Sequence, residues 1–332
     1  MAVYTDITDA ELEQFLAAFD LGAPLTFKGI AEGVENSNFL LETERGRFIL
    51  TVYERRARPE DLPYFLNLMR WLAEHDFPSA TPIADRQGRL LSAIRGKPAA
   101  LASFMPGLSV RRPTVAHCRE AGEGLAWLHQ AGQGYPGRRA NDLGQAAWAG
   151  LFAPLHAEAE ALKPGLAATI VADLDVLERA WPRNLPAGVV HADFFPDNVF
   201  FKGGQFAAAI DFYFACDDLF AYDLATCLNS WCFEADGTFN VTSAQAMISG
   251  YERRRTLSPA EHAALPILCW GSAMRFFLTR LADWGATPPG ALVRPKDPLE
   301  YERKLAVHRA NLGANQGAHQ SGGGLILLDP RP

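Results

Sequence analysis

Short hydrophobic runs separated by turn residues dominate the first third of the chain. Residues 37–43 (SNFLLET) and 47–54 (RFILTVYE) are rich in Phe, Leu, Ile and Val and are joined by a Glu-Arg-Gly segment, which predicts a β-hairpin. Residues 89–95 and 98–104 predict a second pair of strands around a Gly-Lys-Pro turn. Between the pairs, apolar residues over 62–72 recur at intervals of three and four, which predicts a helix with one buried stripe. The region is therefore expected to be a sheet with a helix packed on it.

After this region the pattern becomes mainly helical, starting behind Thr114, a candidate N-cap. Helical spacing of apolar residues then predicts helices over 151–164, 167–181, 218–233, 243–254, 259–284 and 298–311. One strand-rich segment, residues 188–214, interrupts them. We therefore predict an α+β fold with a sheet lobe over 1–105, a helical lobe over 106–312 and a glycine-rich, flexible tail over 313–332.

Composition narrows the class of protein. The 332 residues carry 31 Lys and Arg against 38 Asp and Glu, a net charge of −7, so no overall positive field attracts nucleic acid. No apolar run reaches the ~20 residues that a membrane span needs, and Asp6 and Asp9 stand where a signal peptide would be basic, so we expect a cytoplasmic protein. The five cysteines show no metal or redox spacing, which favours reduced, buried thiols.

The strand-rich segment brings polar residues together. Gly203 and Gly204 form a two-residue hairpin signal, since both tolerate positive φ. A tight turn there would place Asn198 opposite Ala209, so that Asn198 and Asp211 share one face of the hairpin. Two such oxygen-bearing side chains can close around a divalent cation.

A third polar residue completes the arrangement. Asp193 lies in the loop before the hairpin, where its carboxylate could accept a proton from a substrate hydroxyl. An Asp in the loop, an Asn five residues later and an Asp after the next strand are the residues that phosphoryl transfer from a nucleotide requires. Asp193, Asn198 and Asp211 are therefore the candidate catalytic residues, with Asn198 and Asp211 as the metal ligands.

These motifs resemble those of a known superfamily. HADFFPDN (191–198) and IDF (210–212) are similar to the catalytic and metal motifs of the protein-kinase-like superfamily, in the form found in aminoglycoside phosphotransferases and choline kinases. The order of a sheet lobe before a helical lobe agrees with it. The resemblance implies a protein-kinase-like two-lobe fold, ATP and Mg²⁺ as cofactors, and a small-molecule hydroxyl acceptor.

The resemblance also assigns the nucleotide side. Four residues between the first two strands are the expected phosphate-binding group, namely Gly33, Asn36, Ser37 and Asn38. The backbone of three residues between the lobes is expected to meet the adenine ring, namely Ser103, Phe104 and Met105.

One residue departs from the superfamily pattern. Thr51 stands in the strand where a phosphate-binding Lys or Arg is expected. Either Lys28, Arg55 or Arg56 substitutes for that cation, or magnesium and backbone amides neutralise the phosphates unaided, or the chain is an inactive relative. Inactivity is the least favoured reading, because all three motif residues are intact.

One branch of the superfamily resembles this chain closely over residues 1–312, the homoserine kinases, where Thr at the strand position is usual. Segments such as YDLATCLNSWCFE and RFFLTRLADW carry the resemblance. It implies ATP-dependent phosphorylation of L-homoserine, whose carboxylate and ammonium need a cation and an anion beside the base. The candidates are Arg275 and Arg280 for the carboxylate, and Asp217, Asp218 and Asp223 for the ammonium.

Other functions stay open at this point. A related kinase could act on choline, ethanolamine, an aminoglycoside or another hydroxyl acceptor. A pseudokinase that binds nucleotide without turnover is the alternative from another class. The oligomeric state is also left open.

Overall fold

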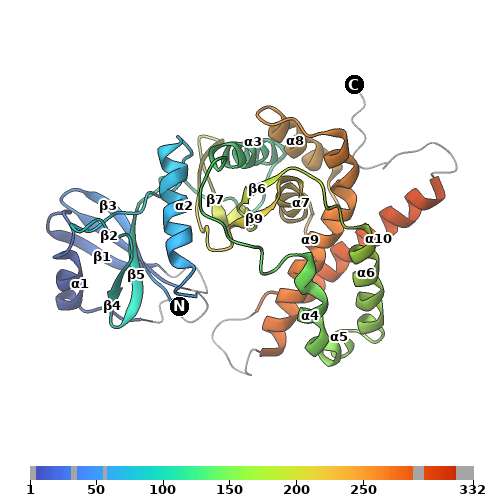
Figure 1. The fold of residues 1–332 in the computed structure, drawn as a ribbon, viewed down its shortest axis with the longest axis horizontal. Helices are drawn as coiled ribbons and strands as arrows, with labels where there is room; N and C mark the ends of the chain where they lie inside the picture. Colours follow the sequence, from blue (N-terminus) through green and yellow to red (C-terminus); the bar gives the residue numbers. More distant parts are fainter. Residues whose placement is uncertain (1–4, 31–35, 55–57, 287–294, 319–332) are drawn as a thin grey trace.

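The computed structural model describes residues 5–30, 36–54, 58–286 and 295–318 of the chain. It consists of a sheet lobe and a helical lobe, with helix α2 (Leu62–Glu74) standing between the sheet and the helices (Figure 1). Apolar residues of α2 pack on both sides, since Phe65 and Leu66 contact the sheet and Leu68 and Leu72 join the core of the helical lobe. The α+β architecture predicted from the sequence pattern is confirmed.

The sheet lobe contains a five-stranded antiparallel sheet in the order β1-β2-β3-β5-β4. The strands are β1 (Pro24–Ile30), β2 (Ser37–Thr43), β3 (Gly46–Val52), β4 (Ser92–Ile94) and β5 (Lys97–Ser103). Burial alternates strictly along β2, because one face of the strand packs on helix α1 (Asp9–Leu16). The sequence pattern did not predict helix α1. The opposite face carries Thr51 and Tyr53 towards α2 and the helical lobe.

The predicted second pair of strands needs one correction. Strand β4 is shorter than predicted, and the turn lies at Arg95 and Gly96 rather than at Gly-Lys-Pro. Both turn residues have positive φ, 52° and 76°, which suits the twist of a two-residue hairpin. Lys97 and Pro98 are therefore already part of β5.

The helical lobe is built around the α7–α9 pair. Its helices are α3 (Val115–Ala131), α4 (Trp148–Phe152), α5 (His156–Leu162), α6 (Leu166–Ala180), α7 (Phe220–Trp231), α8 (Val241–Glu252), α9 (Pro259–Ala286) and α10 (Pro298–Ala318). Two small two-stranded sheets lie among them, β6 (Ala187–Val190) with β9 (Cys216–Leu219) and β7 (Val199–Lys202) with β8 (Gln205–Ala209). The predicted N-cap is confirmed, because the Thr114 hydroxyl accepts the backbone N–H of His117.

Three helix boundaries differ from the prediction. The helix expected over 151–164 is broken into α4 and α5, since Pro154 stands near the start of a short 3₁₀ turn. The helix expected from residue 218 begins at Phe220, because Asp218 and Leu219 pair with β6 instead. Helix α10 continues past the predicted end at 311 to Ala318, and residues 319–332 lie outside the described part of the chain.

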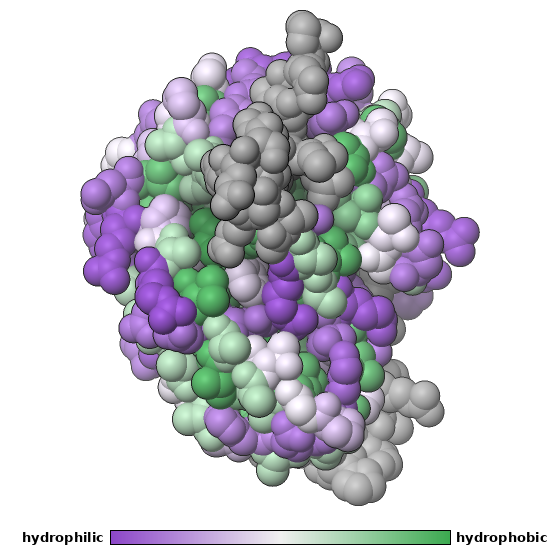
Figure 2. All heavy atoms as spheres, turned by 90° about the vertical axis from the view of Figure 1, so that its right-hand side faces the viewer, coloured by the Kyte–Doolittle hydropathy of each residue, from purple (hydrophilic) through white to green (hydrophobic). Residues whose placement is uncertain are grey.

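The predicted state of the cysteines is confirmed, because all five are free and buried. No helix in the described residues is both long and apolar enough to cross a membrane. The face of the helical lobe seen in Figure 2 mixes hydrophilic and hydrophobic residues.

Close backbone contact between α3 and α8 generates a stability prediction. A Cβ added at Gly122 would lie 2.0 Å from the carbonyl oxygen of Met247, so the two helices would have to separate. Gly122→Ala should lower the free energy of unfolding by about 2 kcal/mol, measured by urea denaturation. Gly150→Ala is the matched control, because nothing lies within 4 Å of its added Cβ and alanine favours a helix. Equal stability of the two variants would contradict the close packing.

Candidate active site

The neutral side chain of His191 holds the loop that follows β6 through hydrogen bonds. The imidazole Nδ1 of His191 accepts the backbone N–H of Asp193 at 3.3 Å, so Nε2 carries the hydrogen and donates to the carbonyl of Ile210 at 3.0 Å. Burial lowers the pKa of His191 to about 4. His191 therefore bridges the catalytic loop, residues 191–198, and the segment that follows β8.

The register of the β7–β8 hairpin differs from the prediction by one residue. Ala209 pairs with Val199 rather than with Asn198, because an irregularity lies between Phe200 and Phe201. The backbone carbonyl of Asn198 instead accepts the backbone N–H of Ile210 at 3.0 Å. Asp211 directly follows Ile210 and therefore lies next to this hydrogen bond.

The three predicted catalytic residues lie in one neighbourhood. The Asn198 amide Nδ2 donates to the Asp193 carbonyl at 2.9 Å and to its carboxylate Oδ2 at 3.0 Å. Burial, and secondly the negative charge of Asp211, raise the pKa of Asp193 to about 8. Asp211 itself is exposed and has a φ of 64°, a conformation that is unfavourable for a non-glycine residue.

This donor set suits a hard divalent cation. Because the Nδ2 of Asn198 faces Asp193, its carbonyl oxygen Oδ1 is turned away from that residue. The exposed carboxylate of Asp211 adds a charged oxygen, and Mg²⁺ usually takes one or two such protein ligands together with substrate phosphates and water. A cluster of three or more His, Cys, Asp or Glu side chains arranged for a metal is not found in the described residues. An ion here would therefore depend on nucleotide phosphates for part of its coordination.

The fully buried carboxylate of Asp223 holds the catalytic loop. It accepts the backbone N–H groups of His191 at 2.8 Å and Ala192 at 2.9 Å, and it pairs with Nε2 of His129 at 3.1 Å. Burial opposes its ionisation, but the hydrogen bonds from the His129 ring and the His191 backbone outweigh burial and hold the pKa of Asp223 below its usual value. The predicted contact with a substrate ammonium is not supported, since both oxygens are already bonded inside the core.

The two arginines predicted to bind the substrate carboxylate also have partners inside the protein. Arg275 is 2% exposed, donates to the carbonyl of Ala192, and lies 4.4 Å from the ring centroid of Phe276. Arg280 is buried and pairs with Glu300 on α10 at 2.6 Å. Arg275 thus acts on the catalytic loop, while its buried Nε has no hydrogen-bond partner in the described part of the chain, and Arg280 joins two helices.

Asp217 and Asp218, the other predicted ammonium ligands, face the segment after α3. The carboxylate of Asp217 accepts the backbone N–H of Arg139 at 2.9 Å and lies 3.9 Å from Arg138 Nη1. Asp218 accepts the side-chain amide of Asn141 at 2.6 Å. Both carboxylates therefore already have hydrogen-bond partners in this segment.

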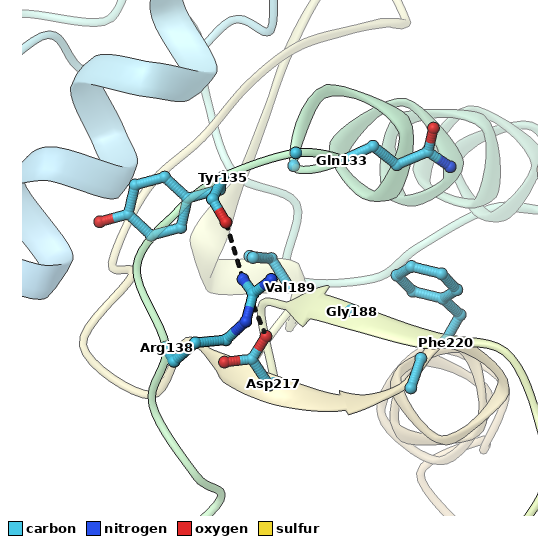
Figure 3. Close-up of a pocket in the computed structure, with 10 residues that line it drawn as sticks. Gln133, Tyr135, Arg138, Gly188, Val189, Asp217 and Phe220 are labelled. Carbon is cyan, nitrogen blue, oxygen red and sulfur yellow. Dashed lines mark hydrogen bonds and ion pairs between the residues drawn. The ribbon is translucent and has the colours of Figure 1, made fainter.

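Asp217 instead lines a pocket of about 360 Å³ between this segment and β6 (Figure 3). In the close-up, Arg138 points at the carbonyl of Tyr135 and at Asp217. The residues that line the pocket include none of the three catalytic candidates. The pocket is thus separate from the candidate active site.

On the nucleotide side, three residues whose backbone amides were predicted to bind phosphate use their side chains to hold the end of the loop to β3. Ser37 is buried, and its hydroxyl accepts the N–H of Thr5 at 3.0 Å and donates to Glu54 at 2.8 Å. The side-chain oxygen of Asn36 accepts the backbone N–H of Glu54 at 3.3 Å. The Asn38 oxygen accepts the Thr51 hydroxyl at 2.8 Å. These side chains therefore build the frame of the loop, whereas Gly33 lies outside the described residues.

Two of the three predicted hinge residues already use their backbone N–H groups in hydrogen bonds within the protein. Ser103 and Phe104 donate their N–H groups to Thr81 at 2.9 Å and Arg47 at 3.1 Å. Within the described chain no partner is recorded for the N–H of Met105, so Met105 stays the candidate for contact with adenine. Of the cations considered as substitutes for the strand lysine, Lys28 is exposed on β1, and Arg55 and Arg56 lie outside the described residues.

Two tyrosines that the sequence analysis did not assign to the site join the lobes there. The hydroxyls of Tyr53 and Tyr213 are 2.9 Å apart, and their rings meet edge to face. Burial raises the pKa of Tyr213 to about 12, against opposing hydrogen bonds from Tyr53 and Thr51. Tyr213 follows Asp211 by two residues, so this contact ties the Asp211 segment to β3.

Comparison with known proteins identifies the family of the chain. The phosphotransferase enzyme family matches residues 26–257, and the chain therefore belongs to that family. Its relatives include the homoserine kinase of Caulobacter sp. (strain K31), 75% identical over 94% of this chain and 98% of the relative. The homoserine kinase of Phenylobacterium zucineum (strain HLK1) is 70% identical over 94% of this chain and 96% of the relative.

Solved structures with the same fold are more distant in sequence. A microcompartment-associated aminopropanol kinase superposes with a TM-score of 0.72 at 19% identity, over 93% of this chain and 98% of the other. An amicoumacin kinase superposes with a TM-score of 0.68 at 17% identity, over 93% of this chain and 94% of the other. The predicted protein-kinase-like fold is confirmed.

The raised pKa of Asp193 generates a pH prediction. In the folded chain without magnesium or nucleotide, Asp193 keeps its proton up to about pH 8, whereas the unfolded chain releases it near the ordinary value of 3.8. The stability that this proton contributes is complete below about pH 4 and is lost as the pH rises through 8. Asp193→Asn does not titrate, so its Tm should rise relative to the wild type between pH 5 and pH 8.5. Asp197→Asn, on the same loop, controls for loss of a carboxylate, and parallel curves for Asp193→Asn and wild type would contradict the prediction.

The buried Asp223 generates a second prediction. Asp223→Asn places an N–H donor against groups that already donate, so the free energy of unfolding should fall by about 3 kcal/mol in urea denaturation. Turnover should fall at least tenfold in the fraction that still folds, because the catalytic loop loses its anchor. Asp217→Asn is the matched control and should change stability by less than about 1 kcal/mol. Similar stability of both variants would refute the anchoring role of Asp223.

Proposed function

We propose that the chain transfers the γ-phosphoryl group of ATP to the hydroxyl of L-homoserine, giving O-phospho-L-homoserine. The observation that carries phosphoryl transfer is the convergence of Asp193, Asn198 and Asp211 at the end of one hairpin. The acceptor is supported by relatives named homoserine kinase that are 70% and 75% identical to the chain over nearly its whole length.

In this proposal Asp193 receives the substrate hydroxyl. Its carboxylate accepts the hydroxyl hydrogen and can hold the proton as the oxygen attacks, and a pKa near working pH suits both tasks. The Nδ2 of Asn198 donates to the same carboxylate and fixes its orientation. The catalytic loop around it is held by Asp223 from one side and Arg275 from the other, so the base is positioned before substrate binds.

Magnesium fits at Asn198 Oδ1 and Asp211, where it would neutralise the phosphates of ATP. This role matters because Thr51, not a lysine, stands in β3, and its hydroxyl is bonded to Asn38. Lys28 lies on the same face of the sheet, opposite Leu40 on β2, and is the described candidate for a further phosphate contact. Ser37 and Asn38 pair with neighbouring strands, so of the predicted phosphate-binding amides that of Asn36 completes the proposed nucleotide side, with Met105 at the adenine.

A coupled ADP-release assay with Mg²⁺ tests this function. We expect turnover with L-homoserine and none with choline, ethanolamine or an aminoglycoside. Asp211→Ala should lower kcat by about 10³-fold or more with an unchanged circular dichroism spectrum, and EDTA should abolish turnover. Asp175→Ala, which removes an exposed carboxylate on α6, is the control.

Each contrary outcome has a distinct meaning. Turnover with choline in place of homoserine would replace the acceptor and keep the enzyme class. ATP binding without turnover on any acceptor would identify a pseudokinase. Normal activity of Asp211→Ala would refute the proposed metal site.

A further inference from the structure

A lysine that the sequence analysis did not single out lies beside the catalytic loop. Lys296 belongs to the connection between α9 and α10. Its ammonium is 3.9 Å from the Asp197 carboxylate and 5.8 Å from the ring centroid of Phe195. Both partners lie between Asp193 and Asn198 in sequence, so a distant part of the chain delivers a cation to this loop.

Arg275 also lies near this loop, but it is less available to a ligand than Lys296. Arg275 is 2% exposed and is bonded to the backbone of Ala192. The Lys296 side chain is 62% exposed and that of Asp197 is 67% exposed. An exposed ion pair at 3.9 Å contributes little free energy, so a ligand can replace it at small cost.

The charge of Lys296 also reaches the candidate base. Burial and Asp211 raise the pKa of Asp193, and the positive charges of Arg275 and Lys296 act in the opposite direction. Lys296 is therefore close enough to Asp193 to act on it electrostatically while its ammonium remains open to solvent.

We infer that Lys296 binds the α-carboxylate of the amino-acid substrate while the substrate hydroxyl lies at Asp193. The inference rests on the proposed function, because it assumes an acceptor that carries a carboxylate. In homoserine a three-carbon chain separates the hydroxyl from the carboxylate, so the cation must lie near the base but not on it. A long, flexible lysine on a neighbouring connection meets that requirement, whereas Arg275 and Arg280 are fixed inside the protein.

The test compares two acceptors that differ only in the carboxylate. L-Homoserine and 3-aminopropan-1-ol share the hydroxyl and the amine, and the second lacks the carboxylate. Lys296→Met should lower kcat/KM for L-homoserine by about 10- to 100-fold, mainly through KM, with little change for 3-aminopropan-1-ol or in the KM for ATP. Lys296→Arg should restore part of the loss, since it keeps the charge.

Lys202→Met is the matched control, since Lys202 is an exposed lysine at the tip of the β7–β8 hairpin. It should leave both acceptors unchanged. Calorimetric titration with L-homoserine gives a second readout, in which Lys296→Met should weaken binding by a similar factor.

The outcomes separate this inference from the function on which it rests. Normal turnover and binding of L-homoserine by Lys296→Met would overturn the inference alone. An equal loss on both acceptors would also overturn it, because Lys296 would then act on the base or the loop. A wild-type chain that neither binds nor phosphorylates L-homoserine would overturn the proposed function and the inference together.

Discussion

The carboxylate of Asp223 holds the backbone of the catalytic loop in a conformation that the loop would not keep alone. Ala192 has a φ of 61°, which costs a non-glycine residue free energy, and Asp223 offsets that cost by accepting its N–H and that of His191. Arg275 bonds the carbonyl of the same residue from α9. Helices α7 and α9 therefore carry opposite charges into the core, and the loop backbone lies between them. The contacts of Asp223 and Arg275 thus stabilise the loop conformation in which Asp193 faces Asn198.

Neutral groups connect the lobes at this site. Tyr53 and Tyr213 share a hydrogen bond, Phe65 packs edge to face on Tyr213, and within the sheet lobe Thr51 bonds Asn38. A lysine at position 51 would bring a charge into this half-buried cluster and would need a counterion there. The hydroxyl groups of this cluster make hydrogen bonds to one another and to the Asn38 amide, so they need no counterion. They connect β2, β3 and the Asp211 segment. Under the proposed function, Lys28 and a divalent ion are the described candidates to neutralise the charge of a bound nucleotide.

Local pattern predicted much of this structure and missed what depends on tertiary contact. Alternation along residues 37–43 identified β2, and the spacing of motif residues brought Asp193, Asn198 and Asp211 together, because both signals are local. The hairpin register was wrong by one residue, since nothing in the composition of β7 and β8 marks the irregularity after Phe200. The break near Pro154 is marked in the sequence by the proline itself, whereas the apolar spacing alone predicts a continuous helix.

Two of the predicted substrate ligands have partners inside the protein. Asp223 and Arg275 were predicted to bind substrate from their charge and their place in the sequence, which do not show burial, but each is buried here with backbone groups of the catalytic loop as its partners. A charge bonded in this way stabilises the conformation of the loop. Under the inference above, recognition of the substrate carboxylate therefore lies with an exposed charge. Lys296 and Asp197 form such an exposed pair, and little free energy is lost when one of them exchanges its partner.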